Sequence, residues 1–191
     1  MTINMSTPGV EIARYAGAMY GLVLDDSTVV SVENAVSSSS LNNVVNGVYA
    51  ADFSTVGNST VATTVATNLG LTGTLLTQAQ AYILAQLNAA PAGSQGATIM
   101  TILNMFGQMT SDPTWGTAAT AWETKVSAAV TYGQNGNNTT NSQMSSMSTA
   151  PSGGIFTLTT GIDNITGMSN NVVNGAANST TGGGHYRYSD G

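Results

Sequence analysis

The chain has 191 residues, of which three are basic and nine acidic, giving a net charge of −6. Three basic residues are too few to neutralise a run of phosphates, which argues against nucleic-acid binding. The absence of cysteine excludes a disulfide framework and a cysteine-ligated metal. Apolar runs are short and broken by Thr, Asn or Gly, so we expect no transmembrane helix.

The surface of this protein must be built largely without charge. Only 6% of the residues are charged, whereas 66 residues are Ser, Thr or Asn. A soluble domain ordinarily has about 25% charged residues, and mixed surface charges keep copies of a protein apart. A surface of hydroxyls and amides is hydrated but repels copies of itself weakly. We therefore expect the chain to pack against neighbouring subunits outside the cell.

Up to about residue 132, apolar residues recur at helical spacing. Pro8 is typical of a first helical turn, and Pro91 follows a predicted helix. Gly70 is placed as a helix C-cap. The pattern predicts helices over residues 8–20, 28–36, 41–49, 59–69, 77–89, 94–109 and 113–130.

The pattern changes after this region. Residues 133–154 are rich in Gly, Asn, Ser and Thr, and we expect them to bury too little apolar surface to offset chain entropy. Apolar and polar residues alternate over 155–159, which predicts a strand. Gly-punctuated segments follow over residues 161–167 and 168–175. The predicted fold class is mainly α: a small helical domain (1–132), a flexible linker (133–154) and a short β-rich, repeat-like assembly segment (155–191).

No catalytic constellation is evident, and we expect no enzyme. His185 lies in a Gly-rich tail, without the packed neighbours that orient a catalytic histidine. Asp25 and Asp26 are adjacent, so their side chains diverge, and we interpret them as a helix cap rather than an acid–base pair. GxSxG, HExxH, P-loop and GxGxxG motifs are absent.

Aromatic and sulfur side chains offer a second set of candidates. Trp115 and Trp122 are seven residues apart and are predicted to share one helix face, either for packing or as an aromatic surface for a sugar or a neighbouring subunit. Methionines at helical spacing are interpreted as core filler, namely Met19, Met100, Met105 and Met109. Met144 and Met147 fall in the predicted linker, where no role is evident.

One segment has a ligand-like pattern. Between residues 161 and 175, Gly-rich turns alternate with Asp or Asn and aliphatic residues, in the manner of the calcium-binding nonapeptide repeat. The candidate calcium ligands are Asp163, Asn164 and Asn171. Because calcium prefers several carboxylate or carbonyl oxygens and only Asp163 supplies a carboxylate, a β-turn stretch without metal is favoured.

The order of these segments resembles the N-terminal region of bacterial surface-layer and related RTX-type surface proteins, over roughly residues 10–175. The likeness is carried by residues 68–73, 79–87 and 122–126, and most specifically by residues 156–167 followed by Asn170 and Asn171. The family's Asn-Asp-Thr-Phe continuation is Asn171-Val-Val-Asn here, which weakens the calcium hypothesis.

The resemblance implies an extracellular location on the bacterial cell surface. It also implies one-step type I secretion, in keeping with residues 1–20, which lack the basic region and compact apolar run of a cleaved signal. It further implies assembly into a lattice or filament, with calcium as a possible cofactor.

Together, these observations predict a structural, self-assembling homo-oligomer of a surface layer, sheath or fibre. The alternative is a helical anchoring module that binds cell-surface polysaccharide (lipopolysaccharide). The residues expected to form subunit contacts are apolar and lie in the C-terminal segment: Ile155, Phe156, Leu158, Ile162, Ile165, Val172 and Val173.

Overall fold

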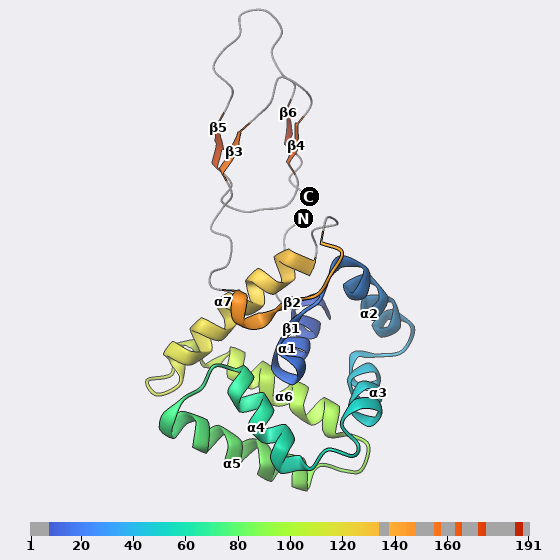
Figure 1. Cartoon of the computed structure of the whole chain (residues 1–191), viewed down its shortest axis with the longest axis vertical. Helices are drawn as coiled ribbons and strands as arrows, with labels where there is room; N and C mark the ends of the chain where they lie inside the picture. The colour runs from blue at the N-terminus through green and yellow to red at the C-terminus, as the bar shows by residue number, and fades with distance from the viewer. Residues whose placement is uncertain are drawn as a thin grey trace, which may run out of the picture. The chain divides into compact units, whose positions relative to one another are not determined.

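The computed structural model describes residues 8–133, 138–147, 155–157, 163–165, 172–174 and 186–188 (Figure 1). The chain divides into two units. One comprises residues 6–150, and the other comprises residues 1–5 and 151–191. The first unit is built from α-helices, which confirms the predicted mainly α fold class.

Seven α-helices are present among the described residues, and their order follows the predicted order. Short 3₁₀ turns follow the sixth helix (η1, Met109–Ser111) and the second strand (η2, Met144–Ser146). The helices are α1 (Pro8–Tyr20), α2 (Asp26–Ser38), α3 (Leu41–Asp52), α4 (Asn58–Asn68), α5 (Gly73–Ala89), α6 (Gln95–Gly107) and α7 (Gly116–Gly133).

Side-chain caps and one glycine set several helix ends. The Asp25 carboxylate accepts a hydrogen bond from the Thr28 backbone N–H, which confirms the predicted cap and starts α2 two residues earlier than expected. Gly70 follows α4 with φ +78°, the left-handed conformation that a C-cap glycine adopts. Pro113 lies outside α7, because the Asp112 carboxylate accepts from the backbone N–H groups of Thr114 and Trp115 and forms a turn there.

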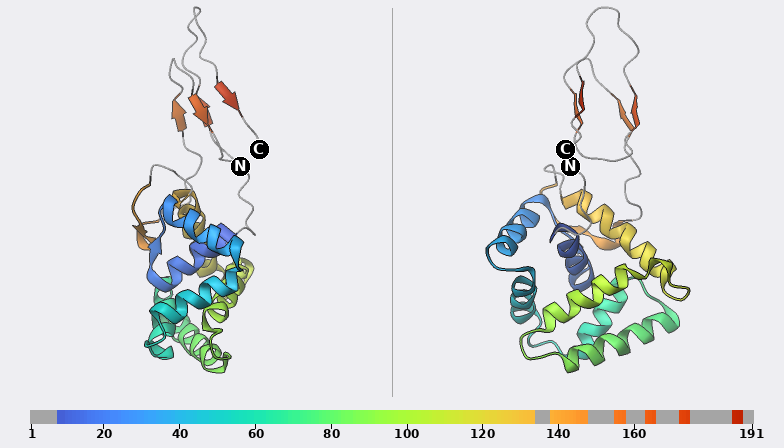
Figure 2. Two further views of the ribbon diagram at one scale, coloured as in Figure 1. Left: turned by 90° about the vertical axis from the view of Figure 1, so that its right-hand side faces the viewer. Right: turned by 180° about the vertical axis from the view of Figure 1, so that it is seen from behind.

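Helix α1 lies in the middle of the helical domain, where it contacts α2, α4, α6 and α7 (Figures 1 and 2). Burying apolar side chains from all these helices supplies the main driving force for folding. The fully buried side chains include Val10, Val61, Val65, Ile83, Leu87, Ile99, Leu103, Trp122 and Val126.

Helices α3 and α6 approach each other closely at Gly96. A Cβ at this position would lie 2.2 Å from the Val45 carbonyl oxygen, far inside van der Waals contact. The crossing is also held by a hydrogen bond from the Ala97 N–H to the Asn46 side-chain oxygen (2.8 Å). Only glycine allows the two backbones to meet at this distance.

Residues 138–147 belong to the helical domain, so the predicted linker over 133–154 is wrong for this stretch. Strand β2 (Ser142–Gln143) pairs antiparallel with β1 (Leu22–Val23). Met144 is only 2% exposed, and the Asn141 side chain accepts from the Asp25 backbone N–H. One methionine fills a hole in the core, and asparagine amides satisfy backbone groups, so a mostly polar segment is ordered without a long apolar run.

The described residues of the C-terminal unit form four short strands: β3 (Ile155–Thr157), β4 (Asp163–Ile165), β5 (Val172–Asn174) and β6 (Tyr186–Tyr188). β3 pairs in parallel with β5, and β4 pairs in parallel with β6. Consecutive strands therefore belong to alternate two-stranded sheets.

Candidate functional site

The predicted assembly residues fall mainly on the C-terminal strands. Ile155 and Phe156 lie on β3 and pair in register with Val172 and Val173 on β5. Ile165 lies on β4, opposite Tyr188 of β6. Leu158 and Ile162 lie outside the described residues. In the described part of the chain, each of these strands is paired with one other strand.

The calcium candidates are divided between the two strand pairs. Asp163 and Asn164 lie on β4, where their partners in register are Tyr186 and Arg187 of β6. Asn171 lies outside the described residues and directly precedes β5, which pairs with β3 instead. No group of three or more acidic, His or Cys side chains suited to a metal occurs among the described residues. Calcium binding stays a prediction.

The acidic pair of α2 acts as a cap. The Asp25 carboxylate accepts hydrogen bonds from the Ser27 hydroxyl (2.7 Å) and the Thr28 backbone N–H (3.0 Å). These bonds lower the pKa of Asp25, with the Ser27 hydroxyl making the largest contribution. A carboxylate held ionised in this way is a poor proton acceptor. The other catalytic candidate, His185, lies outside the described residues.

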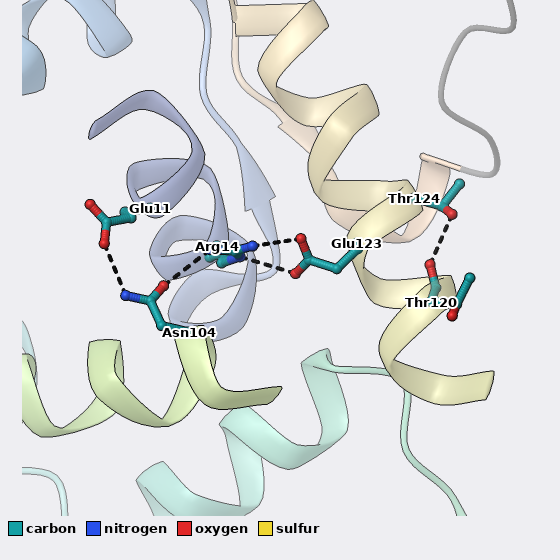
Figure 3. Close-up of polar contacts among 6 residues, drawn as sticks. All are labelled: Glu11, Arg14, Asn104, Thr120, Glu123 and Thr124. Carbon is teal, nitrogen blue, oxygen red and sulfur yellow. Dashed lines mark hydrogen bonds and ion pairs between the residues drawn. The ribbon is translucent and has the colours of Figure 1, made fainter. Parts of the chain in front are cut away.

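A polar cluster that the sequence did not reveal joins α1, α6 and α7 (Figure 3). The Arg14 guanidinium donates two hydrogen bonds to the Glu123 carboxylate, at 3.0 and 2.6 Å, and a third to the Asn104 amide oxygen. The Asn104 amide nitrogen in turn donates to Glu11. The Arg14 and Glu123 side chains are only 13% and 14% exposed, so the pair is largely withdrawn from water.

This cluster holds three helices together. Its bidentate ion pair is the geometry that arginine and carboxylate form most strongly. Gly107 makes room for it, since a Cβ there would lie 2.5 Å from the Glu123 carboxylate. A signal for the pair did exist in the sequence: with so few basic residues, a buried Arg14 needs one of the few acids as its partner.

An apolar groove with a volume of about 400 Å³ lies between α5 and α6. Residues 69–71 and η1 contribute to its walls, together with Trp115. The Trp115 ring contacts Phe106 edge to face, with ring centroids 6.4 Å apart and planes at 85°. Gln78 is the only amide side chain in the wall, and no charged side chain lines it. The arrangement suits an apolar ligand.

The two tryptophans occupy different environments, contrary to the prediction that they share a helix face. Trp115 precedes α7 and lines the groove, whereas Trp122 lies within α7 and is 1% exposed. The methionine interpretation is confirmed for Met19 and Met100, each 2% exposed. It is wrong for Met105, which is 38% exposed at the rim of the groove.

Within the described ranges, no helix is both long and apolar enough to cross a bilayer. Comparison with known proteins gives no further guide: no family model, curated protein or solved structure matches this chain.

Proposed function

We propose that this chain is a structural subunit that assembles with copies of itself outside the bacterial cell, as a surface layer, sheath or fibre. The observation that carries the proposal is the alternate parallel pairing of β3 with β5 and β4 with β6. Each described pair can be extended by adding a strand in the same direction, and extension by a neighbouring copy generates an assembly.

Strand addition is a suitable mode because it uses backbone groups. An unpaired strand edge presents N–H and C=O groups that bind another strand regardless of side-chain charge. Natural proteins commonly protect such edges with lysine or proline, and residues 155–186 contain neither. Asp163 is the only charged residue in this stretch, so repulsion between copies is weak.

The low charge of the helical domain supports the same function. Of its two basic residues, Arg14 is bound to Glu123. Among the acids, Asp25 and Asp112 are hydrogen-bonded to backbone N–H groups at helix starts and turns. Ser, Thr and Asn side chains on the helical domain can bond across a contact between copies as they bond to water.

The proposal is tested on the full chain by analytical ultracentrifugation and electron microscopy, with and without calcium. We expect concentration-dependent particles of regular repeat. Because backbone N–H groups of successive strand residues point to opposite edges, one of the two substitutions Val172→Pro and Val173→Pro removes a donor from the outer edge of β5. That variant should raise the concentration needed for assembly at least about tenfold.

The matched controls are Val172→Thr and Val173→Thr, which keep the backbone donor and a β-branched side chain. They should assemble like the unmodified chain. All variants should have the same helical circular dichroism, since the substitutions lie outside the helical domain. A chain that stays monomeric at high concentration in both conditions, or proline variants that assemble as well as their threonine controls, would contradict the proposal.

A further inference from the structure

We infer that the α5–α6 groove is a binding site for the acyl chain of an anionic amphiphile, with the Lys125 ammonium meeting the head group. This inference concerns the helical domain alone and does not depend on the assembly of the C-terminal strands. Three observations carry it: the size and apolar character of the groove, the exposure of its rim, and the position of an unpaired lysine.

The groove has the size of a small-molecule site. Its volume of about 400 Å³ lies within the range of roughly 300–1,000 Å³ typical of such sites. Aliphatic side chains from both helices form the floor, including Ile83 and Ile102, which are 1% and 6% exposed. Without a charged side chain in its walls, the groove favours a hydrocarbon over a sugar or a peptide rich in polar groups.

The rim of the groove exposes more apolar surface than folding requires. Tyr82 and Met105 are 44% and 38% exposed, and the Tyr82 hydroxyl lies 4.0 Å from the Met105 sulfur. They come from facing helices and both line the groove. The flexible thioether of methionine adapts to ligands of varied shape, and an acyl chain between these side chains would shield both from water.

Lys125 supplies the charge complementarity. Its Nζ would lie 3.8 Å from a Cβ on Gly70, so the ammonium lies against the segment whose neighbours Leu69 and Leu71 line the groove. The single ion pair among the described residues is Arg14 with Glu123, which leaves Lys125 without a carboxylate partner there. An anionic head group beside residues 69–71 would provide one.

The nearest acid in sequence to the groove wall does not compete for this role. Asp112 is close to Trp115, but its carboxylate accepts hydrogen bonds from the backbone N–H groups of Trp115 and Thr114. These two bonds hold the pKa of Asp112 below its ordinary value and occupy the carboxylate in the turn before α7. The groove therefore has a cation beside residues 69–71, while the ionised Asp112 carboxylate is bound to backbone N–H groups in the turn beside Trp115.

Two probes with the same hydrocarbon tail and opposite charge distinguish the contribution of the tail to binding from that of the head group. Laurate and dodecyltrimethylammonium are each titrated into the full-length protein, at a protein concentration where it is monomeric and with both probes below their micelle-forming concentrations. The heat of binding is measured. We expect one laurate per chain, bound about threefold or more tighter than the cation. This preference opposes the net charge of −6, which by itself attracts the cation.

Variants locate the site. Met105→Glu places a carboxylate at the rim and should weaken laurate binding by about tenfold or more. The matched control is Val30→Glu, the same kind of change at a residue 48% exposed on α2 and outside the groove, which should leave laurate binding unchanged. Lys125→Gln should weaken laurate about threefold and should not weaken dodecyltrimethylammonium.

Three outcomes would overturn the inference. The first is the absence of saturable laurate binding to a chain with normal helical circular dichroism. The second is equal binding by the Met105→Glu and Val30→Glu variants, which would place the ligand elsewhere. The third is self-association that Met105→Glu abolishes in the absence of laurate binding, which would make a second copy of the chain the occupant of the groove.

Discussion

The helical domain and the C-terminal strands satisfy their backbone groups in different ways. Within each helix of residues 8–133, N–H and C=O groups bond to each other, and side chains such as Asp25 and Ser40 complete the helix starts. In the strand pairs β3–β5 and β4–β6, each described strand has a partner along one edge. In the first region the helices bond within themselves, whereas in the second the described strands bond to each other in pairs.

This difference assigns separate tasks to the two regions. A domain stabilised by buried side chains responds to changes in packing, whereas a strand edge responds to changes in backbone donors. Under the proposed assembly, the low charge of the chain would permit close contact between copies without specifying the contact. Damage to helix packing should therefore lower the free energy of unfolding without blocking the strand edges.

The largest expected effect is at the crossing of α3 and α6. Gly96→Ala should lower the free energy of unfolding by about 3 kcal/mol, because the added methyl meets the Val45 backbone, which cannot move aside as a side chain would. The measurement is chemical denaturation followed by circular dichroism. Gly47→Ala in α3, with no atom within 4 Å of the new methyl, should instead stabilise by about 0.5–1 kcal/mol. A small loss of unfolding free energy in Gly96→Ala would contradict the close approach of the two helix backbones.

The boundary between the two regions can be tested at Met144. Met144→Ala should cost about 2 kcal/mol of unfolding free energy, since it opens a cavity beside Gly17 and Trp122. Met147→Ala, at a partly exposed position in the same segment, should cost less than about 1 kcal/mol. The measurement is thermal and urea denaturation. If Met144→Ala and Met147→Ala had equal and small effects, residues 138–147 would be a linker and not part of the folded domain.

The polar cluster should contribute less than the core. Arg14→Met should destabilise the helical domain by about 2 kcal/mol, because it leaves the Glu123 carboxylate largely withdrawn from water without its partner. Thr124→Ala on the same helix removes only an exposed bond to the Thr120 carbonyl and should change stability by less than about 0.5 kcal/mol. If the two variants unfold at the same denaturant concentration, the cluster does not clamp the helices.

The smallest effect is the cap of α2, and it should depend on pH. The folded-state pKa of Asp25 is lowered by its hydrogen bonds, so its contribution to stability is present above the unfolded pKa of about 3.9 and is lost as the pH falls through the folded value. Asp25→Ala should therefore lower Tm at neutral pH, and the difference should shrink in acid.

Asp25→Asn is the comparison variant for this prediction. Its amide oxygen can still accept from the Thr28 N–H at any pH, so its stability should follow pH less steeply than that of the unmodified chain. The Tm difference between Asp25→Ala and the unmodified chain could instead stay constant down to acid pH. That result would show that the charge of Asp25 does not contribute to the stability that the cap provides.

Local patterns in the sequence predicted much of the fold. Seven helices, the Asp25 cap, the Gly70 C-cap and the strand at Ile155 follow from periodicity and from residues with strong positional preferences. The candidate groove was missed because its walls come from α5, α6 and residues 69–71, and no local pattern distinguishes a wall residue from a core residue. The exposure of Met105 was missed for the same reason, since its spacing is that of a core methionine.

The sequence by itself determined the local structure and the surface character of each region: helices with apolar faces, a surface nearly free of charge, and short strands punctuated by glycine. Tertiary structure alone decided which of these parts meet. It placed Arg14 against Glu123, 109 positions away, inserted Met144 into the core, and left Tyr82 and Met105 exposed at a groove. The physical reason is that helix formation depends on neighbours within a turn, whereas burial depends on which surfaces the whole chain brings together.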